Sequence, residues 1–427
     1  MENILAPFRG LFKIKNLRNR LIFTALIIGI IRFIAHIPAP GINLSALRDI
    51  FDQSAFLSLL DVFSGGTLGN FSIMALGLNP YINASIILQM LSMVFPKLEE
   101  LRKEGAYGMQ KINQYTRLLT VPLCFLQAIG LLFLLNKQGL TTTSDPFQLA
   151  SIVFTLAAGT GLMIWLGEQI NDYGLGNGIS LLIFVGIISR LPVSAAQLFT
   201  TADQSQIIQY LIFIIATLGV VYGIVKTTEA TREVPIQSAR RGMSSYTQSA
   251  KSHIPLRLNQ AGVIPIIFAV SFMLLPSLLA RVLSGASSPQ LAQFALNLSN
   301  SLSPNSLLYN AIYFVLVVAF TYFYTAVVFN PENIAKDLRQ SGSFIPGIRP
   351  GSNTVDYLNH VLSRVTLVGA FFLGFVAILP AIIANITGLT SLAVGGTGIL
   401  IVVSVVLEIL KSINSQLYMH HYEKFLT

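Results

Sequence analysis

Cysteine and charge are both scarce in this sequence. Cys124 is the one cysteine among 427 residues, which excludes an intrachain disulfide and any site built from several thiolates. Charged residues make up 11% of the chain, whereas a soluble domain has about 25%. Because 53% of the residues are hydrophobic, the polar surface is too small to cover a water-soluble body, and the excess apolar side chains must face lipid.

Residue patterns that carry chemistry are also missing. The five histidines are scattered without metal-binding spacing, and the sequence has no Gly-x-x-x-x-Gly-Lys-Ser/Thr phosphate loop. Within the apolar runs, the main ionisable residues are Arg32, Glu168 and Glu408, whereas ion-coupled transporters keep carboxylates or histidines near the membrane midplane. We therefore expect no catalytic residue, no metal site and no cofactor, and a driving force that comes from a partner or a gradient.

Apolar runs of about 20 residues predict ten membrane-spanning helices. They cover residues 21–38, 72–95, 116–135, 148–168, 178–190 (running on to about 198), 207–226, 262–281, 307–329, 364–386 and 392–413. A tight turn over residues 171–178 separates the fourth helix from the fifth.

Basic residues are distributed unequally between the two sides of this predicted bundle. Of the 27 Lys and Arg residues, 22 lie at the two ends of the chain or in the loops that connect spans 2 and 3, spans 6 and 7, and spans 8 and 9. Four lie in other connecting loops, and Arg32 lies in the first span. By the positive-inside rule, both termini are cytoplasmic and the number of spans is even. The basic residues behind the net charge of +9 therefore serve mainly to orient the protein in the membrane, and secondarily to form a surface that binds a partner.

The segment 55–70, between the first two spans, is apolar but too short to cross a bilayer. It contains Asp61 and the glycines Gly65, Gly66 and Gly69. One interpretation is a re-entrant segment, since non-helical backbone at membrane depth is tolerated only against protein or a water-filled cavity. The other is an ordinary amphipathic external loop, which length alone favours.

The second and seventh spans begin with the same pattern, Gly-x-x-Pro-x-Ile, at residues 77–82 and 262–267. Each is the second span in a set of five, and since five is odd, the two sets cross the bilayer in opposite directions. This is the arrangement of an inverted repeat with a central path between its halves, here 1–200 and 201–427. Chance remains the alternative explanation, because the match is short.

Longer motifs carry a family resemblance. The run 72–91 (SIMALGLNPYINASIILQML) resembles a signature of the SecY/Sec61-alpha family of protein-translocation channels. Further motifs similar to the family's follow in order along the chain, at residues 103–105 (KEG), 114–117 (QYTR), 176–180 (GNGIS), 255–259 (PLRLN), 329–331 (FNP), 344–351 (FIPGIRPG) and 395–397 (GGT). The resemblance covers essentially the whole sequence.

The resemblance implies an all-α integral membrane protein with ten transmembrane helices in two inverted five-helix halves around a central hourglass pore. Such a channel passes unfolded secretory polypeptides across the membrane and releases hydrophobic segments laterally into the bilayer. A ring of aliphatic side chains constricts the pore at the midplane, and the matching residues are Leu78, Ile82, Ile179, Ile183, Ile267 and Ile401. Leu78 departs from the family's commoner isoleucine. An aliphatic ring offers ions and water no hydrogen bonds and therefore resists leakage.

The resemblance assigns three further sets of residues. The plug is the segment 55–70, with Leu59, Leu60, Phe63, Gly65, Gly66 and Gly69. The lateral gate, formed by the second, third, seventh and eighth spans, includes Pro80, Ile86, Gln89, Gln127 and Pro265. Docking residues in the loops 227–261 and 330–363 are Arg240, Arg241, Arg257 and Arg349.

The implied partners are the small membrane subunits SecE and SecG, the motor ATPase SecA, the ribosome, signal peptides, nascent chains and membrane lipid. The implied location is a bacterial plasma membrane or a thylakoid membrane. Arg349, between two Pro-Gly pairs, is the residue we expect motor coupling to need most. For Arg240 and Arg241, setting the topology through positive charge is the simpler alternative.

Two other classes of protein fit parts of the pattern. An inverted-repeat secondary transporter would use polar side chains such as Asn79 and Asn83 to hold a small molecule. A non-conducting membrane scaffold would need neither the 55–70 segment nor a lateral gate.

Overall fold

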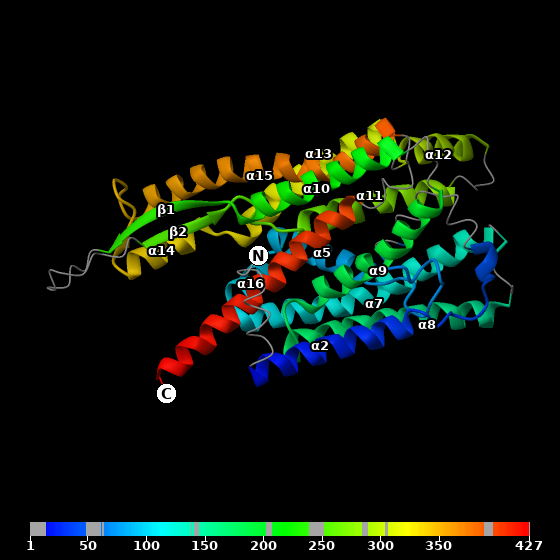
Figure 1. Cartoon of the computed structure of the whole chain (residues 1–427), viewed down its shortest axis with the longest axis horizontal. Helices are drawn as coiled ribbons and strands as arrows, with labels where there is room; N and C mark the ends of the chain where they lie inside the picture. The colour runs from blue at the N-terminus through cyan, green and yellow to red at the C-terminus, as the bar shows by residue number, and fades with distance from the viewer. Residues whose placement is uncertain are drawn as a thin grey trace.

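The chain, represented by a computed structural model, forms an elongated bundle of helices that lie roughly along one axis (Figure 1). The structure describes residues 14–47, 61, 64–137, 139–140, 145–201, 207–238, 252–283, 289–303, 306–387 and 396–426. A helix overlaps each of the ten predicted spans: α2 (Lys15–Ile34), α5 (Asn79–Val94), α7 (Ala106–Lys137), α8 (Pro146–Tyr173), α9 (Gly178–Thr201), α10 (Ile207–Glu229), α11 (Ile264–Leu283), α13 (Leu307–Val328), α15 (Ser352–Thr387) and α16 (Gly396–Leu426).

Several of these helices are long and apolar enough to cross a membrane by themselves. Among the described residues, six helical stretches meet this condition, in α7, α8, α10, α13, α15 and α16, and a seventh does if α5 and the following α6 (Pro96–Lys103), bent by 101°, form one span. The chain is therefore a multi-pass membrane protein, and the count of ten crossings stays a prediction.

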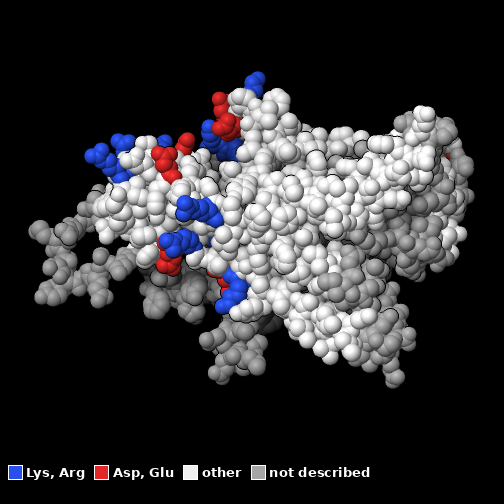
Figure 2. Space-filling view, turned by 90° about the horizontal axis from the view of Figure 1, so that it is seen from above, with Lys and Arg blue, Asp and Glu red and all other residues white. Residues whose placement is uncertain are grey.

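On one face of the bundle, charged side chains are concentrated at one end. Lys, Arg, Asp and Glu side chains gather on the face drawn in Figure 2 at the end that carries β1 (Thr231–Ser238), β2 (Ser252–Arg257) and α14 (Pro331–Gln340), and most of the remaining described surface is white. We call this the charged end. An apolar body with one charged end suits a bundle whose middle lies in a hydrocarbon layer about 30 Å thick.

The second span differs from its prediction. Ser72 forms an isolated antiparallel β-bridge with Pro38, residues 73–78 form turns, and the helix α5 starts only at Asn79. The prediction of a helix from residue 72 was wrong because an apolar run does not distinguish a buried turn from a helix. In the ninth span, α15 instead begins before its predicted start, at Ser352.

The connection between α10 and α11 is not a plain loop. The strands β1 and β2 pair antiparallel, with Thr231 opposite Arg257, and β3 (Ser343–Phe344) pairs with the other edge of β1. A small core beneath them is formed by Val234, Leu256, Ile345 and Leu358. The all-α expectation therefore fits the bundle, whereas the charged end carries a three-stranded sheet that the sequence analysis missed.

The two Gly-x-x-Pro patterns produce the same local structure. Gly77 and Gly262 have φ angles of +59° and +64°, a region that glycine adopts without steric cost. Two residues later the helices α5 and α11 begin, with Pro80 and Pro265 as their second residues. A proline in the first turn sacrifices no helical hydrogen bond. The same helix start therefore occurs at both positions, and α5 and α11 pack against each other.

Candidate functional site

The six predicted ring residues lie in one apolar cluster. Its buried members include Leu78, Ile82, Ile183 and Ile401, and Ile179 and Ile267 are partly buried against it. The six residues come from the start of α5 and from α9, α11 and α16. Segments far apart in the sequence therefore meet in a centre that offers water no hydrogen-bonding group along these side chains.

The turn that contains Gly65 packs directly beside this cluster. A Cβ atom on Gly65 would lie 2.8 Å from the Cα of Gly186, and one on Gly186 would lie 2.7 Å from the Cα of Gly65. A Cβ atom on Gly77 would lie 3.1 Å from the Cα of Ser64. Gly186 lies one helical turn beyond Ile183 on α9. Glycines thus allow the segment to approach two positions next to ring residues.

Hydrogen bonds within the segment define the shape of this turn. The backbone nitrogen of Gly66 donates to the Asp61 carbonyl at 2.8 Å, and that of Gly69 donates to Asp61 Oδ1 at 2.6 Å. Asp61, Ser64, Gly65 and Gly69 are buried and Gly66 is half-buried, which is not the environment of an ordinary external loop. Three predicted plug residues, Leu59, Leu60 and Phe63, lie outside the described residues.

Two hydrogen bonds place the turn between α8 and α9, and with it Ile179. Asn171 Oδ1 accepts from the nitrogen of Gly178 at 2.7 Å, and Asn177 Oδ1 accepts from that of Ile179 at 3.1 Å. A Cβ atom on Gly178 would lie 1.9 Å from the carbonyl oxygen of Gly167. The predicted tight turn is confirmed, and it holds the start of α9 against α8.

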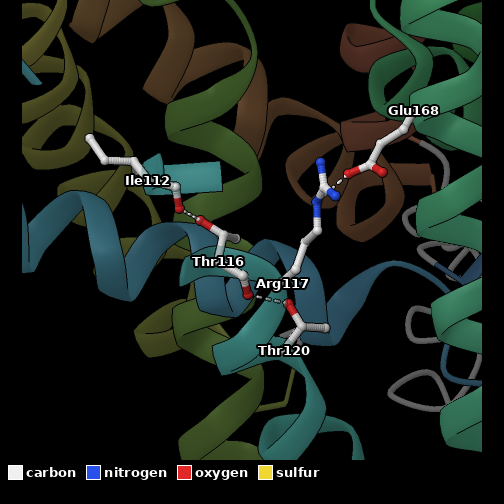
Figure 3. Close-up of polar contacts among 5 residues, drawn as sticks. All are labelled: Ile112, Thr116, Arg117, Thr120 and Glu168. Atoms are coloured by element: carbon white, nitrogen blue, oxygen red, sulfur yellow. Dashed lines mark hydrogen bonds and ion pairs between the residues drawn. The ribbon is translucent and has the colours of Figure 1, made fainter. Parts of the chain in front are cut away.

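A polar cavity of about 510 Å³ lies on the side of Ile179 that faces α7 and α8. Its lining includes Tyr81, Arg117, Glu168 and Asp172. Across it, Arg117 Nε lies 2.6 Å from Glu168 Oε1 (Figure 3). Glu168 is one of the ionisable residues that the sequence places within an apolar run, but its partner on the preceding helix was not predicted.

Two neighbouring threonines on α7 keep their polar groups within the helix. Thr116 Oγ1 donates to the Ile112 carbonyl at 2.9 Å, and Thr120 Oγ1 donates to the Thr116 carbonyl at 2.7 Å (Figure 3). Both side chains are buried. Because their hydroxyl groups are already satisfied, they can be buried among apolar neighbours without an unpaired donor.

The predicted gate residues lie on three helices that pack together. α11 packs on both α5 and α7; Pro80, Ile86 and Pro265 are buried, and Gln89 and Gln127 are partly buried. Gln89 Nε2 donates to Ser85 Oγ at 3.0 Å, whereas Gln89 Oε1 is buried with no hydrogen-bond partner among the described residues. An unpaired amide oxygen is costly to bury and is therefore available to a donor that enters between these helices.

At the charged end, Arg102 connects α6 to α13. Its guanidinium donates to the carbonyl of Val327, in the last turn of α13. A cation there satisfies a carbonyl that has no partner within the helix and interacts favourably with the helix dipole. On the same face of α6, Lys103 Nζ lies 2.7 Å from Glu99 Oε1. The hydrogen bond from Lys103 lowers the pKa of Glu99. From the sequence, Arg102 is only one of the basic residues of the loop between spans 2 and 3 that indicate the orientation of the bundle.

Two of the four predicted docking arginines are described, and both are exposed at the charged end. Arg257 ends β2, and Arg349 lies in the turn between β3 and α15. This turn is fixed at both sides: Ile345 is buried in the small core, and Thr354 Oγ1 donates to the Arg349 carbonyl at 3.0 Å. Arg240 and Arg241 lie outside the described residues.

Comparisons with known proteins agree with this arrangement. The sequence model of the SecY family matches residues 72–410. Relatives named protein translocase subunit SecY include one from Staphylococcus carnosus, 40% identical over 98% of both chains, and one from Staphylococcus aureus, 39% identical over 97% of both. Among solved structures, one titled as a protein-conducting channel has a TM-score of 0.64 at 18% identity, covering 93% of this chain and 92% of that one. Canine Sec61 in a ribosome–channel complex has a TM-score of 0.62 at 17% identity, with the same coverage.

Proposed function

Because this chain belongs to the SecY family, we propose that its six aliphatic ring residues seal a polypeptide pore and that the Gly65 turn closes the outer side of that seal. The chain is the channel subunit of a protein translocase and not an enzyme. It passes unfolded polypeptides across a membrane and releases hydrophobic segments sideways into lipid. The similarity of its sequence to translocase subunits favours this function over the transport of a small molecule at Asn79 and Asn83.

The contact between Gly65 and Gly186 is the observation that carries the proposal. α9 begins at the turn that follows α8 and leads away from the charged end (Figure 1). Gly186 therefore lies farther from that end than Ile183 does, by about 4.5 Å measured along the axis of α9. If the charged end faces the cytoplasm, the turn rests on the ring from the outside. The aliphatic ring and the contact between the two glycines contain no polar bond of their own, so both can separate without losing one.

The lateral gate in this proposal is the contact of α5 and α7 with α11, together with the neighbouring α13. A segment that reaches this contact partitions by hydrophobicity, at roughly −0.5 kcal/mol for each Leu or Ile and roughly +3 kcal/mol for a central charge. About 20 apolar residues thus favour lipid. The unpaired oxygen of Gln89 supports the assignment, because it offers a passing backbone N–H an acceptor.

The charged end is the proposed cytoplasmic docking surface, with both termini on the same side. Exposed Arg257 and Arg349 suit the phosphates of ribosomal RNA or an acidic protein surface. Sec61, whose fold this chain shares, is bound to a ribosome in its complex, which supports a ribosome as one partner. The motor SecA and the small subunits SecE and SecG complete the proposed assembly, in a bacterial plasma or thylakoid membrane.

Site-specific crosslinking tests the pore. A photo-crosslinking amino acid in place of Ile183 or Ile401 should react with a secretory polypeptide that is arrested during export. The same probe in place of Ile215, which is 60% exposed on α10, should react with lipid instead. Equal yields at the ring and at Ile215 would contradict the assigned path.

A further inference from the structure

Arg32 is a charged residue in an apolar helix, and its role is unexplained by the pore and the gate. It lies near the end of α2, after Ile27 and Ile31, which are buried in the central cluster. A charge in a membrane span is costly, so such residues usually face a protein partner or water and serve a function. The side chain of Arg32 is partly buried, and therefore it does not simply extend from the bundle surface.

The partner of Arg32 belongs to the turn beside the ring. Arg32 Nη1 donates to the carbonyl oxygen of Gly65 at 3.2 Å. Hydrogen bonds to a charged group are stronger than those between neutral groups, particularly where water is scarce. Gly65 therefore makes both contacts: its Cα packs against Gly186, and its carbonyl oxygen accepts the hydrogen bond from Arg32.

The turn can dock as a unit because several of its described polar groups bond to one another. Ser64 Oγ donates to the Asp61 carbonyl at 3.0 Å and accepts from the nitrogen of Leu68 at 3.2 Å. Thr67 Oγ1 donates to the Ser64 carbonyl at 2.7 Å. Against this internal network, the bond from Arg32 to Gly65 reaches outside the turn, to another element of the bundle.

We propose that Arg32 is a positioning residue that holds the Gly65 turn against Gly186 and so keeps the channel's outer closure in its resting place. This inference rests on the proposed pore function and adds a residue to it. Among the described contacts, release of the turn breaks the hydrogen bond from Arg32 and the contact between Gly65 and Gly186. An opened, hydrated channel would supply water to the freed guanidinium, so the bond stabilises the closed position without making it irreversible.

Thiol labelling in the assembled translocase tests this role directly. Ser64→Cys places a thiol in the buried turn, and a membrane-impermeant maleimide added from the outer side reports how often the turn leaves its seat. Adding Arg32→Gln should raise the labelling rate at least severalfold, and Arg32→Lys, which keeps the charge but loses the planar fork, should raise it less. The matched control is Arg20→Gln, since Arg20 lies on the same helix and donates to the Gly174 carbonyl at 3.4 Å.

An unchanged labelling rate in Arg32→Gln would overturn the proposal. If Arg32→Gln does not accumulate in the membrane, the labelling rate of Arg32→Lys is measured instead, and an unchanged rate in that variant overturns the proposal. The labelling result does not depend on whether the ring seals the pore. A failure of the crosslinking at Ile183 and Ile401 would therefore contradict the pore, whereas unchanged labelling would contradict only the role of Arg32.

Discussion

Arg117 on α7 and Glu168 on α8 form an ion pair, with 2.6 Å between Nε and Oε1, beside a polar cavity that borders the ring residue Ile179 (Figure 3). The pair links two neighbouring helices of the first half. The side chains are 52% and 23% exposed, so solvent weakens the attraction.

A double-mutant cycle should measure this link. Arg117→Gln, Glu168→Gln and the double variant are expected to give a coupling of about 0.5–1 kcal/mol in the free energy of unfolding, as for other partly exposed pairs. Thermal unfolding of the purified complex supplies the values. Additive effects of the two single substitutions would mean that the contact contributes nothing to stability.

Gly186→Ala should displace the Gly65 turn. The new Cβ atom would lie 2.7 Å from the Cα of Gly65, a distance that forces the backbone to move. We expect an ion conductance through the resting channel that the unmodified protein lacks. Gly219→Ala on α10 is the control, since a Cβ atom there meets nothing within 4 Å; a tight Gly186→Ala channel would contradict the close contact.

Removing the Arg102 side chain should loosen the gate at the charged end. Arg102→Ala leaves the Val327 carbonyl without this donor and removes the link between α6 and α13. Export of a substrate with a weakly hydrophobic signal peptide should increase a fewfold. Lys103→Ala, which removes the adjacent cation and its bond to Glu99, should leave export unchanged; equal gains in both variants would indicate a general effect of charge.

Reversing the charge at Arg349 should stop motor-driven export while the protein still inserts and folds. The turn around Arg349 is anchored by Ile345 and by the bond from Thr354, so Arg349→Glu presents a carboxylate at the same place. SecA-dependent export into vesicles is the measurement. Arg339→Glu on the neighbouring α14, also exposed, is the control, and full export by Arg349→Glu would exclude the docking role.

Much of the bundle was predictable because a helix that crosses a lipid bilayer needs about 20 consecutive apolar residues. Apolar runs of the required length overlap every long helix described. The helices α5 and α11 both start inside the Gly-x-x-Pro pattern, although the apolar run had placed the start of the second span at residue 72. The strands β1 and β2 were missed because their eight and six residues include Pro235 and Pro255 within a charged connection. Such a composition is typical of a loop.

The contacts that complete the site were not readable from the sequence. The closeness of Gly65 to Gly186, and the bonds of Arg32 and Arg102, join residues whose separation in the chain says nothing about their distance in space. Backbone acceptors leave no pattern of residue types at all. The ring itself came from the family resemblance, since each aliphatic residue alone is indistinguishable from ordinary core.

Ion conductance of the resting channel tests the central claim most directly. In planar bilayers that contain the assembled translocase, the double variant Ile82→Ser, Ile267→Ser should open a steady conductance, because hydroxyl groups let water and ions enter the constriction. Ile215→Ser on the lipid-facing α10 provides the comparison. The account predicts a leak in the double variant and none in the comparison. A resting membrane that stays as tight with the double variant as with the unmodified chain would contradict a seal built from these side chains.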